Sequence, residues 1–382
     1  MNLTSFFFRI TSSIESKAVN IYSVSTEEQN SYLNRLREPR DLTDRSYLQY
    51  KCQMYLKNRM SRILYNLLSL PLIIYYLLKQ SDNSDVKENT QAVFLGLGLS
   101  TDLIPDELLL EYKEIINLET CKEGLDCFDR KYIFRLWKRY PLAFMFVLKC
   151  IIKIRMYSYI IRTYRPNAII TSEEYSFVSS CITDYCREKN IEHINIMHGE
   201  KVFFIRDAFV EFDRFYVWDE YYVNLFIDMR AAENQFLISV PKALKIDKID
   251  VSLKKVDFTY YLANEDKESL RRIASNLKKL REGGNIIAVR CHPRYTDIHD
   301  VKQIFKDVAL IEINEELSIR ESLQRTKNAI SLFSTVLNQA YSNDINPIID
   351  DISSPEKFIE LKNVRYRFAD LDKEHLLSFY LE

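Results

Sequence analysis

The 382-residue sequence predicts an α/β fold with two Rossmann-like domains facing a central cleft and a helical N-terminal portion. Three observations lead to this prediction. From residue 167 onward, short apolar runs alternate with helical segments, which indicates βαβ units and parallel sheets. The length suits about two domains, and a 47% share of hydrophobic residues is enough for sizeable cores. We expect an N-terminal domain over 1–215 and a C-terminal domain over 216–382.

The predicted first half begins with mostly helical and irregular chain over residues 1–90. Apolar spacing of three to four residues indicates helices, and short apolar runs indicate buried strands. Predicted helices are 131–163 and 175–190, and predicted strands are 92–100, 167–174 and 192–200, with a strand that turns into a helix at 213–226.

The predicted second half repeats this alternation. A charged helix at 267–284 stops at Gly283-Gly284, as helices often do. The further predicted helices are 319–327 and 336–343, and the predicted strands are 257–263, 285–293, 308–314, 328–335 and 346–350.

Net charge and cysteine content indicate which partners and which cellular compartment to expect. The formal net charge is −1, which argues against nucleic acid as a main partner. Seven scattered cysteines include no CxxC pair, so we expect free thiols rather than disulfides or a zinc site. Residues 1–17 have no charged start before their apolar patch, so we expect no signal peptide.

One apolar segment raises the question of a membrane. Residues 63–78 are sixteen residues long, shorter than the ~20 that a spanning helix needs, and they follow Lys57, Arg59 and Arg62. The pattern suits either a core helix broken at Pro71 or a basic and apolar surface that docks on an anionic membrane.

Polar residues cluster where the predicted strands end, and in open α/β sheets ligands bind at that edge. In the first half these residues are Ser172-Glu173-Glu174 and His198-Gly199-Glu200. A carboxylate here can act as a general base, and a pair of them can shift each other's pKa. The same pair equally suits the first turn of the next helix. His198 can contact a substrate or a loop, and Gly199 permits close approach of the backbone.

In the second half the strand ends carry His292-Pro293 and Ser334-Thr335, which lie 42 positions apart. An imidazole beside Arg290 and Arg294 suits an anion, and proline fixes the backbone next to it. Hydroxyls before a helix suit a phosphate or a plain N-cap. A phosphate held by this half and a base from the other half would form a transferase site.

These motifs resemble those of the bacterial sialyltransferases and polysialyltransferases of the GT-B fold. That family carries an acidic pair followed by glycine, then His-Pro, then a Ser-Ser or Ser-Thr pair. The matching positions are Glu173-Glu174, His292-Pro293 and Ser334-Thr335, and Tyr175 stands in place of the glycine. The resemblance covers about residues 165–350.

The resemblance implies an inverting, metal-independent transfer of sialic acid from CMP-sialic acid to a surface glycan such as O-antigen, capsule or lipooligosaccharide. Glu173 or Glu174 would deprotonate the acceptor, and His292 would stabilise the leaving phosphate. Donor-binding positions would be Pro293, Arg294, Ser334 and Thr335, with His198 and Gly199 from the first half. No metal or other cofactor is expected. A lipid-linked acceptor implies a cytoplasmic protein at the inner face of the membrane.

Three alternatives remain open at the level of sequence. The donor can be another activated sugar, CMP-Kdo or a UDP-sugar. The chain can be a nucleotide-sugar 2-epimerase, although these enzymes usually have a serine-glycine-glycine turn where this chain has Ser331-Leu332-Phe333-Ser334. It can also be a non-catalytic scaffold for glycan assembly.

Overall fold

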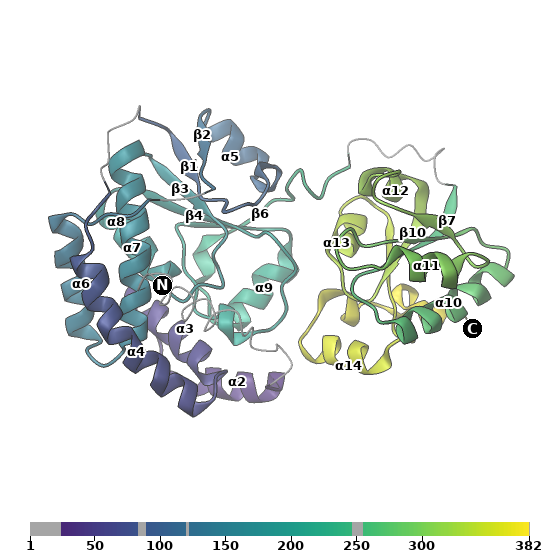
Figure 1. Cartoon of the computed structure of the whole chain (residues 1–382), viewed down its shortest axis with the longest axis horizontal. Coiled ribbons are helices and arrows are strands. Elements are labelled where there is room, and N and C mark those ends of the chain that lie inside the picture. The colour runs from purple at the N-terminus through teal and green to yellow at the C-terminus, as the bar shows by residue number, and fades with distance from the viewer. Residues whose placement is uncertain (1–23, 83–88, 120–121, 247–254, 382) are drawn as a thin grey trace. The chain divides into compact units, whose positions relative to one another are not determined.

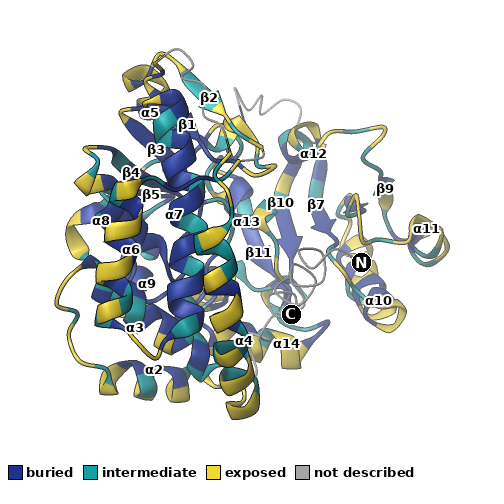
Figure 2. Ribbon diagram, turned by 60° about the vertical axis from the view of Figure 1, so that its left-hand side comes forward, coloured by how far each residue is buried: buried dark blue, intermediate teal, exposed yellow. Residues whose placement is uncertain are grey.

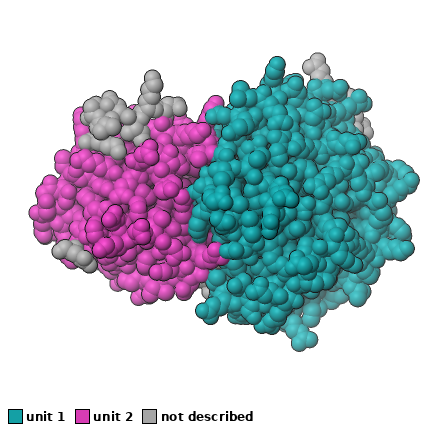
Figure 3. All heavy atoms as spheres, turned by 180° about the vertical axis from the view of Figure 1, so that it is seen from behind, with its two compact units in different colours: residues 1–198, 203–239 teal, residues 199–202, 240–382 magenta. Residues whose placement is uncertain are grey.

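The computed structural model describes residues 24–82, 89–119, 122–246 and 255–381 (Figure 1). The chain forms two compact units, each with its own parallel sheet (Figure 3). Unit 1 comprises residues 1–198 and 203–239, and unit 2 comprises residues 199–202 and 240–382. The predicted α/β fold class with two Rossmann-like units is confirmed. Residues 1–17, for which we expect no signal peptide, lie outside the described residues.

The sheet of unit 1 has six parallel strands in the order β2-β1-β3-β4-β5-β6. Central strands are buried on both faces and are rich in Ile, Val and Ala, as expected for a parallel sheet covered by helices. The strands are β1 (Ala92–Phe94), β2 (Ile115–Asn117), β3 (Ala168–Thr171), β4 (Glu192–Ile196), β5 (Arg214–Val217) and β6 (Phe236–Ile238).

Helix α7 (Phe144–Tyr164) is the central helix of unit 1. It is apolar on most of its sides and buried along most of its length, which Figure 2 shows in dark blue. The other helices of unit 1 are α2 (Thr26–Arg35), α3 (Leu42–Tyr55), α4 (Arg59–Leu78), α5 (Asp106–Glu111), α6 (Cys127–Arg139), α8 (Ser179–Glu188) and α9 (Glu220–Asp228).

Two apolar clusters cover the two faces of this sheet. One joins Val93 and Ile169 to side chains of α4, α6, α7 and α8. The other joins Phe94 and Ile170 to Leu108 of α5. A capping box at Asp126 and Asp129 starts α6. The predicted helical N-terminal portion is confirmed by α2, α3 and α4 within the described residues.

The sheet of unit 2 has five parallel strands in the order β11-β10-β7-β8-β9. They are β7 (Val256–Tyr261), β8 (Ile287–Arg290), β9 (Leu310–Glu312), β10 (Thr326–Ser331) and β11 (Asn346–Ile349). The helices are α10 (Lys267–Glu282), α11 (Ile298–Phe305), α12 (Ile319–Arg325), α13 (Thr335–Tyr341) and α14 (Pro355–Asn363). One face packs on α10 and α11, and the other packs on α12 and α13.

Each sheet has a point at which its strand order reverses. In unit 1 this switch lies between β1 and β3, and in unit 2 it lies between β7 and β10. Loops that leave the carboxyl ends of these two strands run to opposite sides, which leaves a crevice where α/β proteins bind ligands. The fold alone therefore marks one candidate site in each unit.

Three expectations differ from the structure. The predicted domain boundary at 215/216 falls inside β5, and the chain passes to unit 2 after Ser239. Helix α4 is not a core helix broken at Pro71, because it runs unbroken from Arg59 to Leu78 and buries only Ser69, Leu72 and Ile73. Glu173 and Glu174 do not start a helix, because α8 begins at Ser179. The six cysteines that the structure describes are free, as expected.

Candidate functional sites

Unit 2 has a cavity of about 440 Å³ at its switch point. Its lining follows the carboxyl ends of β7, β8, β9 and β10, so four strand ends contribute side chains to one space. The lining residues are Tyr261, Leu262, Arg290, Cys291, His292, Pro293, Asn314, Ser318, Ile319, Ser334, Thr335 and Val336. The structure thus brings His292-Pro293 and Ser334-Thr335 together.

The imidazole of His292 is held in one orientation. Its Nδ1 accepts the backbone N–H of Arg294 at 3.1 Å, and its ring stacks on Tyr295 with centroids 4.7 Å apart. A neutral ring that accepts at Nδ1 carries its proton at Nε2. Partial burial, and to a lesser degree the Arg294 charge, lower the pKa of His292, so the ring is neutral at pH 7. His292 therefore offers an N–H donor at the cavity.

Ser334 and Thr335 stand where β10 gives way to α13. The Ser334 hydroxyl accepts the N–H of Val336 at 3.2 Å, so it caps this helix. Capping and ligand binding are compatible, because the same hydroxyl has a second lone pair and a rotatable proton. Thr335 is exposed at the cavity.

Arg290 lines the cavity, whereas the predicted Arg294 is exposed and is not among the lining residues. The buried guanidinium of Arg290 donates to Asn314 Oδ1 at 2.9 Å and to the Leu317 carbonyl at 2.8 Å. Its Nη1 lies 3.7 Å from Glu312 and makes no hydrogen bond. The sequence signal for Arg290 was its place as the last residue of β8.

Unit 1 has a cavity of about 530 Å³ at the carboxyl ends of β1 and β3. Its lining includes four cationic side chains, Lys57, Lys149, Lys153 and Arg206, and one carboxylate, Glu173. Burial and the nearby Lys153 charge lower the pKa of Lys149 to about 8. The apolar part of the wall includes Met54, Met145, Ile152, Phe177 and Phe204. This cavity suits an amphipathic anion.

The two predicted bases have different surroundings. Glu174 is fully buried, and its Oε2 accepts from Asn195 Nδ2 at 3.0 Å. Glu173 has 7% of its side-chain surface exposed and pairs with Lys153 in the cavity wall. Asn195 also accepts the Glu173 backbone N–H at 2.8 Å, so one side chain positions both residues.

His198 lies beside this carboxylate pair. The Ser172 hydroxyl donates to the Ile196 carbonyl at 2.7 Å, so its 2.6 Å contact with His198 Nδ1 makes the imidazole the donor there. Nδ1 also lies 3.6 Å from Glu174 Oε1. Because Nδ1 makes these contacts, Nε2 is the ring nitrogen that would exchange a proton with a substrate. About 30% of the His198 side chain is exposed.

Gly199 has no structural need to be glycine. It has no positive φ angle, and an added Cβ would meet no atom within 4 Å. The Glu200 carboxylate accepts a hydrogen bond from Asn338 of α13.

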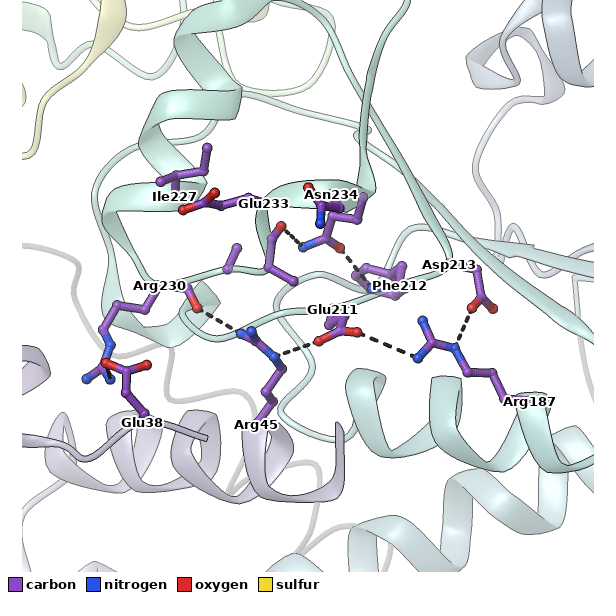
Figure 4. Close-up of a pocket in the computed structure, with 13 residues that line it drawn as sticks. Glu38, Arg45, Arg187, Glu211, Phe212, Asp213, Ile227, Arg230, Glu233 and Asn234 are labelled. Carbon is purple, nitrogen blue, oxygen red and sulfur yellow. Dashed lines mark hydrogen bonds and ion pairs between the residues drawn. The ribbon is translucent and has the colours of Figure 1, made fainter. Parts of the chain in front are cut away.

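A third cavity, of about 590 Å³, lies at the opposite edge of the unit 1 sheet, before β5 and β6. Figure 4 shows that its charged side chains point toward one another. Arg45 pairs with Glu211 at 2.6 Å, and Arg187 pairs with Asp213 at 2.6 Å. Because these charges neutralise each other at the amino ends of strands, we assign this cavity a structural role.

No family model matches the sequence, and no curated protein matches it. Among the described residues, no group of three or more His, Cys, Asp or Glu side chains is placed to hold a metal ion.

Solved structures resemble the chain at low sequence identity. UDP-GlcNAc 2-epimerase from Neisseria meningitidis bound to UDP-GlcNAc matches with a TM-score of 0.39 and 11% identity over 77% of this chain and 93% of that chain. The wall teichoic acid polymerase TagF matches with 0.37 and 11% over 82% and 85%. The lipopolysaccharide outer core galactosyltransferase WaaB matches with 0.39 and 9% over 69% and 81%.

Proposed function

We propose that this protein is an inverting glycosyltransferase of the GT-B type that takes a nucleotide-activated sugar in unit 2 and a glycan acceptor in unit 1. The observation that carries the proposal is the unit 2 cavity. It places an N–H donor, hydroxyls and a buried arginine at the switch point of a Rossmann-like sheet.

The unit 2 side chains suit a phosphate that gains charge in the reaction. As the bond between the anomeric carbon and the phosphate oxygen breaks, the nucleotide leaves with the electron pair. Fixed donors aimed at that oxygen stabilise the transition state more than the ground state. His292 Nε2–H, Ser334 and Thr335 are the groups that we assign to this role, with Pro293 fixing the imidazole position. Arg290 replaces Arg294 as the arginine at this site.

The unit 1 side chains suit acceptor activation. The new bond joins the anomeric carbon to an acceptor oxygen, and the hydroxyl proton must pass to a base. Glu173 lines the cavity, whereas Glu174 is buried and its Oε1 lies 3.6 Å from Nδ1 of His198, which is not among the lining residues of this cavity. We therefore propose Glu173 or the His198 imidazole as the base, with Glu174 stabilising the imidazolium. His198 thereby moves from the donor to the acceptor side of the proposal.

The charge of the unit 1 cavity favours an anionic acceptor. Arg206 pairs with Asp207 and Lys153 with Glu173, and Lys57 and Lys149 add further positive charge to this partly apolar space. Surface glycans that carry acidic sugars or phosphate groups fit this chemistry. Sialic acid from CMP-sialic acid is the donor that the motif resemblance favours, within a role in capsule or lipopolysaccharide biosynthesis.

The experiment that tests this proposal is a donor screen that measures released nucleotide. Purified protein is incubated with CMP-, UDP-, GDP- and CDP-linked sugars, each with and without an anionic glycan acceptor. We expect acceptor-dependent release of CMP from CMP-sialic acid. Release from another donor would change the sugar and keep the reaction class. Conversion of a UDP-sugar without acceptor would establish an epimerase, and the absence of any turnover together with no nucleotide binding would favour a scaffold.

A further inference from the structure

The exposed face of α4 is apolar along its whole length. The side chains on this face have between 37% and 78% of their surface exposed. They recur every three to four residues, so they form one stripe on the helix. We call this the α4 stripe, and it consists of Met60, Ile63, Leu64, Leu67, Leu70, Ile74 and Leu78. A surface helix normally exposes polar side chains to water, whereas α4 exposes apolar ones. Figure 2 shows α4 with yellow, exposed residues along its outer side.

The orientation of α4 is fixed by polar contacts on its other side. Asn66 donates to the Leu142 carbonyl at 2.8 Å and accepts the Met145 backbone N–H at 3.1 Å at the start of α7. Rotation of the helix to bury the stripe would expose apolar contacts with α7 and break both Asn66 bonds. The Asn66 bonds and the contacts with α7 therefore keep the stripe on the outer side of the helix.

Helix α4 itself carries charges of one sign. It contains no Asp or Glu, and Lys57 and the exposed Arg59 lie at its start, whereas Arg62 is partly buried on another side of the helix. Lys79, which follows its end, pairs with Glu123. An apolar stripe with cations at its start and no carboxylate on its own helix complements a lipid bilayer with anionic headgroups.

The geometry distinguishes a helix that lies on a membrane from one that crosses it. With 20 residues and an 18-residue window of mean hydropathy 1.4, α4 is long and apolar enough to span. However, α4 packs along α7, and α7 is a buried helix of the unit 1 core. Only the outer side of α4 is available, so the helix can enter the headgroup region only sideways.

We infer that the α4 stripe, together with Lys57 and Arg59 at its start, is a docking surface for an anionic lipid bilayer, with α4 lying in the plane of the interface. Lys57 also lines the unit 1 cavity, so docking would hold that cavity close to the headgroups. A lipid-linked acceptor would then reach the cavity from the membrane. This last consequence depends on the proposed function, whereas the docking itself does not.

The test is cosedimentation of the full chain with vesicles, because it needs no enzymatic activity. One vesicle is pure phosphatidylcholine, and the other holds equal parts of phosphatidylcholine and phosphatidylglycerol. We expect wild-type protein to pellet with the anionic vesicles and to be released by high salt. Leu64→Gln and Leu67→Gln should each weaken binding by about tenfold or more. Arg59→Gln should weaken it by about fivefold, on anionic vesicles alone.

The matched control is Leu110→Gln, which changes a leucine on α5 that is even more exposed than Leu64 and Leu67. It should bind like wild type. All variants should keep the wild-type circular dichroism and melting temperature, since the changed side chains are exposed. Failure of wild type to pellet, or equal binding by the stripe variants and the control, would overturn the proposal. Wild-type dimers that the stripe variants convert to monomers, without vesicle binding, would identify a second copy as the occupant and overturn it as well.

Discussion

His292 offers the sharpest test of the donor side of this account. Its Nδ1 accepts the Arg294 N–H, which leaves the Nε2 proton directed by a fixed ring. If this N–H stabilises the departing phosphate, His292→Ala removes one preorganised donor. Loss of such a donor costs about 3–4 kcal/mol in the transition state, or ~10²–10³ in kcat. Folding should be nearly unaffected, because the side chain is only partly buried and stacks on an exposed tyrosine.

The assay is nucleotide release at saturating donor and acceptor, with kcat and KM measured separately. We expect His292→Ala to lose ~10²–10³ in kcat with a smaller change in KM, because the lost contact strengthens in the transition state. His292→Gln should recover part of kcat, since its amide can donate from about the same place as Nε2. His299→Ala is the matched control, an exposed histidine on nearby α11, and should be unchanged. A kcat of His292→Ala within threefold of wild type, at unchanged stability, would refute the assignment.

Two further predictions concern stability. The His193 imidazole is buried against Tyr157 and Thr183, and burial lowers its pKa to about 3. Because the folded pKa lies below that of the unfolded chain, its contribution is complete above about pH 6.5 and falls as the pH drops. Urea unfolding should show about 2 kcal/mol lost from this group between pH 7.5 and pH 5. His193→Gln should reduce the pH slope accordingly, and an unchanged slope would contradict the reasoning. Asn195→Leu removes both bonds that position Glu173 and Glu174 and leaves buried groups unpaired, so we expect a loss of about 3 kcal/mol in unfolding free energy. A loss below about 1 kcal/mol would show that these bonds are replaced.

Much of the fold could be predicted because strand periodicity in a parallel sheet is a local signal. The apolar runs that end at Thr171, Ile196, Arg290 and Ser331 are all strands of the two sheets. The predicted strands 167–174, 192–200, 285–293 and 328–335 each end three or four residues beyond the observed strand, because the polar residues after the strand were counted with it. The meeting of His292 with Ser334 at one cavity still followed from chain order and the rule that parallel strands end at one edge.

Other features depend on packing that no short window of sequence contains. The sequence of residues 63–78 is compatible with a buried helix and with an exposed one. The hydrogen bonds of Asn66 to Leu142 and Met145, at the start of α7, determine which side of the helix is buried. Glu173 and Glu174 are adjacent in sequence and both buried, but Asn195 binds only the Glu174 carboxylate, while Glu173 lines the unit 1 cavity. Strands β2 and β6 have three residues each, too few to show a period. The domain boundary lies at Ser239 because β5 and β6 pair within unit 1.

Hydrogen–deuterium exchange with and without CMP locates nucleotide binding on the chain and so tests whether unit 2 holds the donor. We predict slower exchange in residues 290–296 and 334–337 and unchanged exchange in 211–213 and 230–235, which border the charge-neutralised cavity of unit 1. Protection confined to the latter segments, or no protection at millimolar CMP, UDP, GDP and CDP, would contradict a donor site at the switch point of unit 2.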